Sequence, residues 1–198
     1  MPAGRRAGSD GEQRRAQIIT VAQRSIAMLG FEGLRVRDVA DQVGINIATL
    51  HYYFPSKESL VKAVVDRILG DLEPVPRIDP GTDPEAVLAE HIKRILDRFE
   101  ADRDGFVVLN ELNARAGRDP ELRATLQAND EAWAGFLRPL FASGRENGQF
   151  RSDLDPDAAA AIVIGFLKSL LSQFGLTPEL TRRAADELLR SVSVRNRG

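Results

Sequence analysis

Residues 46–57 concentrate side chains that can contact nucleic acid. They are Asn46, Thr49, His51, Tyr52 and Lys57, which supply amide, hydroxyl, imidazole, phenol and ammonium groups. Groups of these kinds bind the phosphates of a duplex and reach the edges of its bases. Lys57 also stands where a helix is expected to begin, so its charge and the free backbone N–H groups can hold one phosphate together. This segment is therefore the candidate site for nucleic-acid contact.

Other chemistry is poorly represented in the chain. The 198 residues include no cysteine and two histidines, His51 and His91. This composition excludes a disulfide framework, thiolate catalysis and a metal centre rich in Cys or His. No glycine-rich phosphate loop and no histidine paired with a nucleophile at motif spacing is found. We expect no metal and no cofactor, and an all-α enzyme is a weak alternative.

Two short helices with a tight turn between them are predicted to position this segment. The ranges 36–43 and 47–53 have helical apolar patterns, and Ala40 is small enough for a close helix crossing. Gly44 tolerates the left-handed conformation of such a turn, and Asn46 is a good N-cap for the second helix. The apolar residues around the turn are Val39, Val43, Ile45 and Leu50. The pattern predicts a helix-turn-helix.

Helical signals continue through the rest of the chain. A helix is expected from Glu12 to Gly30, and Ser56 is expected to cap another from Lys57 to about Leu72. Four N-cap residues are followed by proline at the first helical position; these pairs are Asp83-Pro84, Asp119-Pro120, Asp155-Pro156 and Thr177-Pro178. Asp104 is expected to cap a helix from Gly105, and Pro139 is expected to kink or split the pattern over 121–147. We predict an all-α protein of about nine helices.

Composition and charge suggest how the chain is divided. The predicted parts are a disordered basic arm over 1–11, a helix-turn-helix domain with a connecting helix over 12–72, a Pro-rich linker over 73–82 and a helical domain over 83–198. Residues 1–70 contain 10 Lys+Arg and 7 Asp+Glu, a net charge of +3, whereas the remainder has a net charge of -5. The total of -2 therefore averages a basic first part and an acidic second part.

Neither a membrane span nor a secretory signal is expected. No apolar run approaches the ~18 residues that a span requires. Residues 1–15 are polar and contain arginine, with no apolar stretch after them. We therefore expect a cytoplasmic protein.

The segment from Gly30 to Leu60 resembles the DNA-binding domain of the tetracycline-repressor (TetR) family of bacterial regulators. The resemblance is carried by Gly30-Phe31, Val36-Arg37-Asp38-Val39-Ala40, Gly44-Ile45 and Thr49-Leu50-His51-Tyr52-Tyr53-Phe54-Pro55-Ser56-Lys57-Glu58-Ser59-Leu60. It implies that residues 46–53 are the recognition helix. The DNA-contact residues that it implies are Arg37, Asn46, Ile47, Thr49, His51, Tyr52 and Lys57. Ile47 and the order His51-Tyr52 depart from residues common in the family, which bears on the operator sequence and not on the fold.

The resemblance also implies a C-terminal region that binds an effector. A pocket for a small organic effector is expected among the middle helices, because pockets are mostly apolar with a few polar anchors. The predicted lining residues are His91, Phe106, Asn110, Asn113, Trp133 and Phe136. The alternative is that these aromatic residues form ordinary core. Since the chain has no cysteine, sensing through thiolates is excluded and an organic ligand is favoured.

The last two helical patterns, 158–171 and 178–194, are the candidate dimer interface. Helix-turn-helix proteins usually dimerise to read two half-sites about one helical turn, ~34 Å, apart. The first pattern is apolar nearly all round, which requires burial on more than one side. The predicted interface residues are Ile162, Phe166, Leu170, Leu188 and Val192, and the alternative is that they form the core of one subunit.

The sequence as a whole favours a regulator of transcription. We interpret the chain as a homodimeric repressor that binds a palindromic operator in double-stranded DNA and leaves it when a small effector binds. A constitutive DNA-binding protein without a ligand is an alternative that would use the same first part of the chain.

Overall fold

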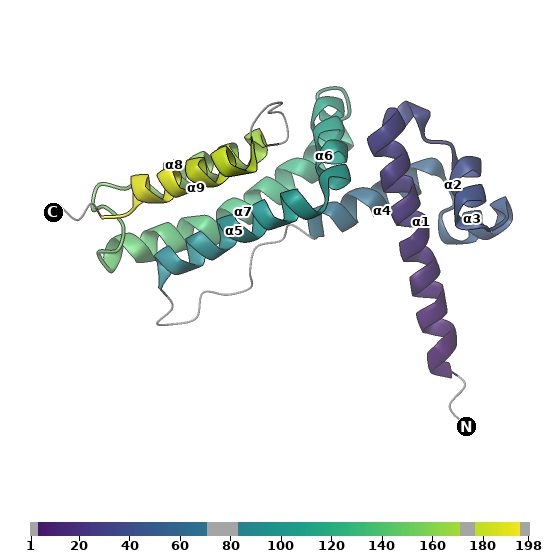
Figure 1. Cartoon of the computed structure of the whole chain (residues 1–198), viewed down its shortest axis with the longest axis horizontal. Helices are drawn as coiled ribbons and strands as arrows, with labels where there is room; N and C mark the ends of the chain where they lie inside the picture. The colour runs from purple at the N-terminus through teal and green to yellow at the C-terminus, as the bar shows by residue number, and fades with distance from the viewer. Residues whose placement is uncertain (1–3, 71–82, 171–176, 195–198) are drawn as a thin grey trace. The chain divides into compact units, whose positions relative to one another are not determined.

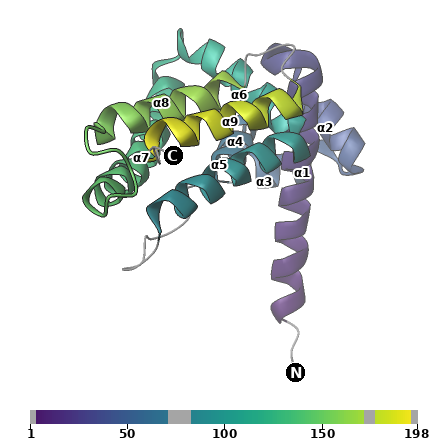
Figure 2. The same ribbon diagram turned by 60° about the vertical axis from the view of Figure 1, so that its left-hand side comes forward.

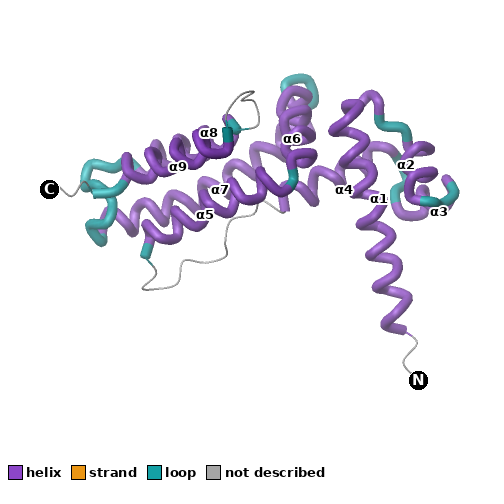
Figure 3. Tube along the Cα trace, viewed as in Figure 1, coloured by secondary structure: helices purple, strands orange, loops and turns teal. Residues whose placement is uncertain are grey.

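The computed structural model describes residues 4–70, 83–170 and 177–194, and every regular element in them is a helix (Figure 3). The helices, labelled in Figure 1, are α1 (Gly4–Gly33), α2 (Val36–Val43), α3 (Ile47–Tyr53), α4 (Lys57–Gly70), α5 (Pro84–Ala101), α6 (Arg103–Ala116), α7 (Pro120–Glu146), α8 (Pro156–Ser169) and α9 (Pro178–Val192). Among these residues, Phe150 and Ser193 form an isolated antiparallel bridge. The prediction of an all-α protein of about nine helices is confirmed.

The chain divides into two compact units. The first comprises Met1–Asp71 and Asp104–Leu112, and the second comprises Leu72–Arg103 and Asn113–Gly198. The predicted linker over 73–82 lies outside the described residues. Residues 104–112 group with the helix-turn-helix helices, whereas the sequence assigns them to the C-terminal domain. Helical periodicity could not reveal this grouping, because it shows which face of a helix is apolar but not which helix covers that face.

Helix α1 is longer at its N-terminal end than the sequence predicts. It begins at Gly4, so the expectation of a disordered arm over 1–11 is wrong for residues 4–11. Extending an existing helix needs no new nucleation, which favours helix in the residues that precede a packed one. Near the other end, Gly30 has φ 69° and ψ 175°, and the helical path breaks there as predicted.

Helices α2 and α3 have the predicted ranges. Gly44 adopts the left-handed conformation, with φ 74° and ψ 36°, and its N–H bonds to the carbonyls that end α2. Asn46 caps α3, since its side-chain oxygen accepts a hydrogen bond from the Thr49 N–H at 2.7 Å. Helix α3 ends at Tyr53, just before Phe54 and Pro55. The helix-turn-helix is therefore confirmed residue by residue.

Helix α4 starts with a reciprocal cap. Ser56 Oγ accepts a hydrogen bond from the Ser59 N–H at 3.1 Å, and Ser59 Oγ accepts one from the Ser56 N–H at 3.1 Å. This arrangement satisfies two backbone donors that the helix would otherwise leave unpaired. The prediction that Ser56 caps this helix is confirmed.

Apolar faces of α1 to α4 form the core of the first unit. Its fully buried residues include Ile18, Ala22, Ile26, Val39, Leu50, Leu60 and Val64. Arg67 of α4 also donates to Thr20 Oγ1 at 2.8 Å and to Gln23 Oε1, so polar bonds hold α1 and α4 together. Because Leu50 is part of this core, the rotation of α3 about its own axis is fixed.

In the second unit, α7 packs against α5 and α8, and α9 packs against α5 (Figure 2). The four predicted caps are confirmed, because backbone N–H groups donate to the side-chain oxygens of Asp83, Asp119, Asp155 and Thr177. The core residues of these helices include Leu88, Ile92, Leu137, Leu140, Phe141 and Val163.

One expectation about the second half of the chain was wrong, and one of the two alternatives for Pro139 is excluded. Helix α6 begins at Arg103, so Asp104 lies in its first turn and does not cap it. Helix α7 is continuous from Pro120 to Glu146, so Pro139 does not split it. A proline removes one backbone hydrogen bond, and here buried side chains on both sides of it, Leu137 and Leu140, keep the helix packed.

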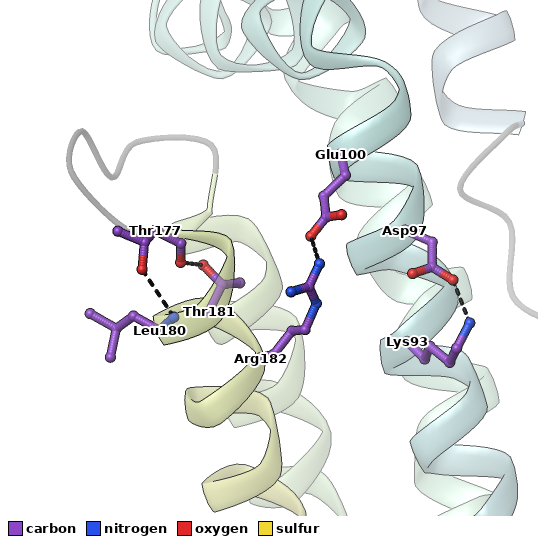
Figure 4. Close-up of polar contacts among 7 residues, drawn as sticks. All are labelled: Lys93, Asp97, Glu100, Thr177, Leu180, Thr181 and Arg182. Carbon is purple, nitrogen blue, oxygen red and sulfur yellow. Dashed lines mark hydrogen bonds and ion pairs between the residues drawn. The ribbon is translucent and has the colours of Figure 1, made fainter.

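Polar contacts on α5 and α9 supplement the apolar packing (Figure 4). Arg182 of α9 forms an ion pair with Glu100 of α5 at 2.6 Å. Lys93 and Asp97 form a second pair at 2.5 Å within α5. Both pairs are largely exposed, and such pairs are worth at most about 1 kcal/mol. The packing of the second unit therefore depends chiefly on its apolar residues.

Candidate nucleic-acid interface and effector region

Helix α3 is anchored by one side and exposed on the other. Leu50 is fully buried, whereas Tyr52 is 82% exposed and Ile47 is 37% exposed. His51 is exposed as well. Imidazole and phenol groups displayed in this way on a helix that fits a major groove can reach base edges and phosphates. The exposed face of α3 is the candidate DNA-reading surface.

The remaining predicted contact residues lie close to α3 in the sequence and belong to the same unit. Asn46 uses its side-chain oxygen to cap α3, so it has a structural role in starting the helix. Thr49 is half-buried beside it. Arg37 is exposed in the first turn of α2. Lys57 is the first residue of α4 and is half-buried, at a helix start that favours an anion.

Sequence reasoning missed a cation next to the end of α3. The guanidinium of Arg15, on α1, lies 5.2 Å from the centroid of the Phe54 ring. Phe54 is 2% exposed, so it belongs to the core. Tyr53 is half-buried and meets the Tyr52 ring edge to face at 5.3 Å. No periodic signal could have found Arg15, because the contact joins α1 to a residue that is distant in the sequence.

Three of the predicted pocket residues lie together in the second unit. His91 of α5 is fully buried, and its Nε2 accepts a hydrogen bond from Trp133 Nε1 of α7 at 2.6 Å. The Phe136 ring lies 5.1 Å from the imidazole. Burial, and secondarily the charge of Arg94, lowers the pKa of His91 to about 4, so this side chain is neutral at pH 7. Among the described residues, its Nδ1 has no hydrogen-bond partner.

The other three predicted pocket residues do not join this cluster as a group. Phe106 and Asn110 belong to the first unit, and Phe106 is buried there. Asn113 belongs to the second unit. The boundary between the units crosses α6 between Leu112 and Asn113. The predicted pocket therefore combines residues of two different units.

The predicted dimer residues separate into exposed and buried sets. On α8, Ile162 is 59% exposed and Phe166 is not buried, and on α9 Leu188 is half-buried. Leu170 and Val192 are 4% and 5% exposed, so they pack inside the subunit and the prediction that they lie on a free interface is wrong. The reason is that the apolar residues of these helices also cover the neighbouring helices of the same chain, and only α8 is apolar enough to leave a second apolar face exposed.

Within the described parts of the chain, none of the helices is long and apolar enough to cross a membrane. Those parts also contain no group of three or more His, Cys, Asp or Glu side chains arranged to hold a metal ion.

Two short helices joined through a left-handed glycine, with the second helix facing outward, define a DNA-binding protein of the helix-turn-helix class. Residues 18–64 match the family of bacterial regulatory proteins called tetR, and residues 84–193 match the C-terminal region of the BetI-type transcriptional repressors. The chain belongs to the TetR family of bacterial transcriptional regulators. The resemblance inferred from the sequence is confirmed.

Curated relatives and solved structures agree with this assignment. The chain is 29% identical over 166 residues to the HTH-type transcriptional repressor KstR2 of Rhodococcus jostii, covering 80% of this chain and 77% of that protein. It is 28% identical over 146 residues to the HTH-type transcriptional repressor NicS of Pseudomonas putida, covering 72% and 68%.

Two solved structures share its fold at low sequence identity. The ketosteroid transcriptional regulator KstR2 of Mycobacterium tuberculosis matches with a TM-score of 0.73 and 20% identity, covering 92% of this chain and 96% of that one. A transcriptional regulator of Saccharomonospora viridis, solved in complex with choline, matches with a TM-score of 0.73 and 23% identity, covering 93% and 100%.

Proposed function

We propose that this regulator is a homodimeric repressor that binds a palindromic operator and leaves it when a small organic effector binds its C-terminal region. The observation that carries the DNA-binding part is the geometry of α3. Leu50 fixes the helix in the core while His51 and Tyr52 are exposed on it. The contact residues are Arg37, Asn46, Ile47, Thr49, His51, Tyr52 and Lys57. Since its target is bacterial DNA, we expect the protein to act in the cytoplasm.

We expect the protein to bind its operator as a dimer. The DNA-binding part of each subunit, residues 1–70, is called the reading head below. Its net charge of +3 gives it a small electrostatic attraction for DNA. Two heads on one operator add their contacts and read two half-sites. Helix α8 supports this proposal with an accessible face free of charged side chains, formed by Ala158, Ala161, Ile162 and Gly165. We propose that this face, with Phe166 and with Leu188 of α9, forms the interface between subunits.

The effector is proposed to bind beside His91 and Trp133. A buried polar atom without a partner costs free energy, and the His91 Nδ1 is such an atom among the described residues. With Nε2 accepting from Trp133, the neutral imidazole carries its proton on Nδ1 and can donate it to an acceptor on a bound molecule. A coupling of about 1–3 kcal/mol between this site and operator binding is typical of ligand-controlled regulators.

The proposal can be tested in two stages with the full-length protein. Genomic fragments that bind the protein are selected and sequenced, and we expect two inverted half-sites about one helical turn apart. Candidate compounds are then added to the complex, beginning with choline and a ketosteroid because the relatives' descriptions name these chemistries. Release of DNA by a compound supports the repressor. Failure to enrich any duplex would refute DNA binding, and enrichment that no compound from a broad panel reverses favours the constitutive alternative.

A further inference from the structure

The start of helix α1 lies against the end of the recognition helix. The guanidinium of Arg15 is 5.2 Å from the centre of the Phe54 ring, and Phe54 directly follows α3. One helical turn earlier, a Cβ at Gly11 would be 3.9 Å from the Tyr53 hydroxyl. Two positions one turn apart on α1 therefore lie next to Tyr53 and Phe54, at the end of α3.

The charge of Arg15 is available to another molecule. Its side chain is exposed, and in the described part of the chain its guanidinium forms no ion pair with a carboxylate. The cation–π contact with Phe54 restrains it without neutralising it. Its neighbour Arg14 instead donates to Gln17 at 3.2 Å. A restrained but uncompensated cation next to a DNA-reading helix is suited to a phosphate.

Helix α1 also continues past this contact. Residues 4–10 are helical and project beyond the first residue that meets α3 (Figure 1). At 1.5 Å per residue, these seven residues extend α1 by about 10 Å. The helix is thus long enough to reach DNA phosphates beyond those next to α3.

We infer that Arg15 is a phosphate contact of the reading head, and that the start of α1 forms with α3 a composite surface for the backbone of double-stranded DNA. This inference rests on the proposed operator binding and adds a contact outside the helix-turn-helix. The competing explanation is that Arg15 only covers the buried Phe54 ring. The two explanations differ in salt dependence, because only a phosphate contact releases counterions.

The test measures the affinity of the full chain for a labelled duplex of about 30 base pairs and arbitrary sequence, by fluorescence anisotropy between about 50 and 200 mM salt. Arg15→Met keeps an aliphatic cover over Phe54 but removes the charge, and Arg15→Lys keeps the charge. Arg24→Met is the matched control. Arg24 is also exposed on α1 and lies nine residues further on, or two and a half turns, which places it on the opposite side of the helix.

One lost phosphate contact flattens the slope of log affinity against log salt by about 0.9 per head, or about 1.8 for a dimer. Raising the salt fourfold lowers the affinity of both proteins. The factor by which it falls should be about 3.5 times smaller per head for Arg15→Met than for wild type. We expect Arg15→Lys and Arg24→Met to keep the wild-type slope.

Two results would overturn the inference. One is a slope for Arg15→Met equal to that of wild type while Lys57→Met flattens it, which would leave the proposed function intact. The other is a loss of affinity that is the same at every salt concentration, which would assign Arg15 a purely structural role. If wild type itself binds no duplex, the proposed function fails together with this inference.

Discussion

The buried imidazole of His91 should make the second unit sensitive to acid. Its pKa is about 4 in the native protein, against 6.5 for an unperturbed histidine, the value expected in the unfolded chain. Between these two values the unfolded chain binds the proton more readily than the native one. The free energy of unfolding therefore falls as the pH falls through this window, and the stabilisation is complete above about pH 6.5.

The size of the effect follows from the two pKa values. Going from about pH 7.5 to pH 5, this one group should lower the free energy of unfolding by about 2 kcal/mol. His91→Gln keeps an acceptor for the Trp133 N–H but does not titrate. Its loss of stability over the same pH range should be smaller than that of wild type by about 2 kcal/mol. Any loss of packing in the variant cancels, because each protein is compared with itself at two pH values.

Urea unfolding monitored by tryptophan fluorescence is the appropriate assay. Trp133 is the only tryptophan in the chain and donates its N–H to His91, so it reports on this site. A change of about 2 kcal/mol shifts the urea midpoint by about 1 M at a typical denaturant dependence. His51→Gln is the matched control, because it removes an exposed histidine and should keep the wild-type behaviour. Equal pH dependence in wild type and His91→Gln would refute the reasoning.

Three further predictions concern single substitutions. Asn46→Ala removes the cap of α3 and should cost about 1 kcal/mol, measured by urea unfolding followed by far-UV circular dichroism; an unchanged midpoint would contradict the capping role. Gly144→Ala adds a Cβ that overlaps the Phe150 ring and should destabilise the second unit by about 1–3 kcal/mol in the tryptophan assay, with the exposed Gly135→Ala as the control. Gly165→Phe has open space around its Cβ, so the subunit should fold normally while light scattering shows a weakened dimer; a dimer of unchanged affinity would argue against the α8 interface.

The elements decided by local backbone chemistry were predicted to the residue. The ranges of α2 and α3 follow from Gly44, which takes the left-handed conformation, and from Asn46, whose side chain caps the next helix. Ser56 and the four cap–proline pairs are of the same kind. Each depends on interactions between residues no more than four positions apart, and these can be read directly from a single sequence.

Features that depend on tertiary packing were predicted less well. Apolar periodicity identified Leu170 and Val192 as buried but could not tell a neighbouring helix from a second subunit. In the same way it grouped Phe106 with His91, although they belong to different units. The contact between Arg15 and Phe54 could not be predicted either, because it joins α1 to the residue after α3, which is distant in the sequence. Of the candidate site, the recognition helix was predictable and its surroundings were not.

The most direct test of the account is the affinity for a selected operator of three variants, His51→Ala, Tyr52→Ala and Lys57→Ala, measured at one fixed salt concentration. The first two side chains are exposed and the third is half-buried at a helix start, so none is needed for the core and each variant should keep the wild-type circular dichroism. Contacts of this kind are worth about 1–3 kcal/mol, so each variant should bind at least about fivefold more weakly. Wild-type affinity in all three variants would contradict the assignment of α3 as the DNA-reading helix.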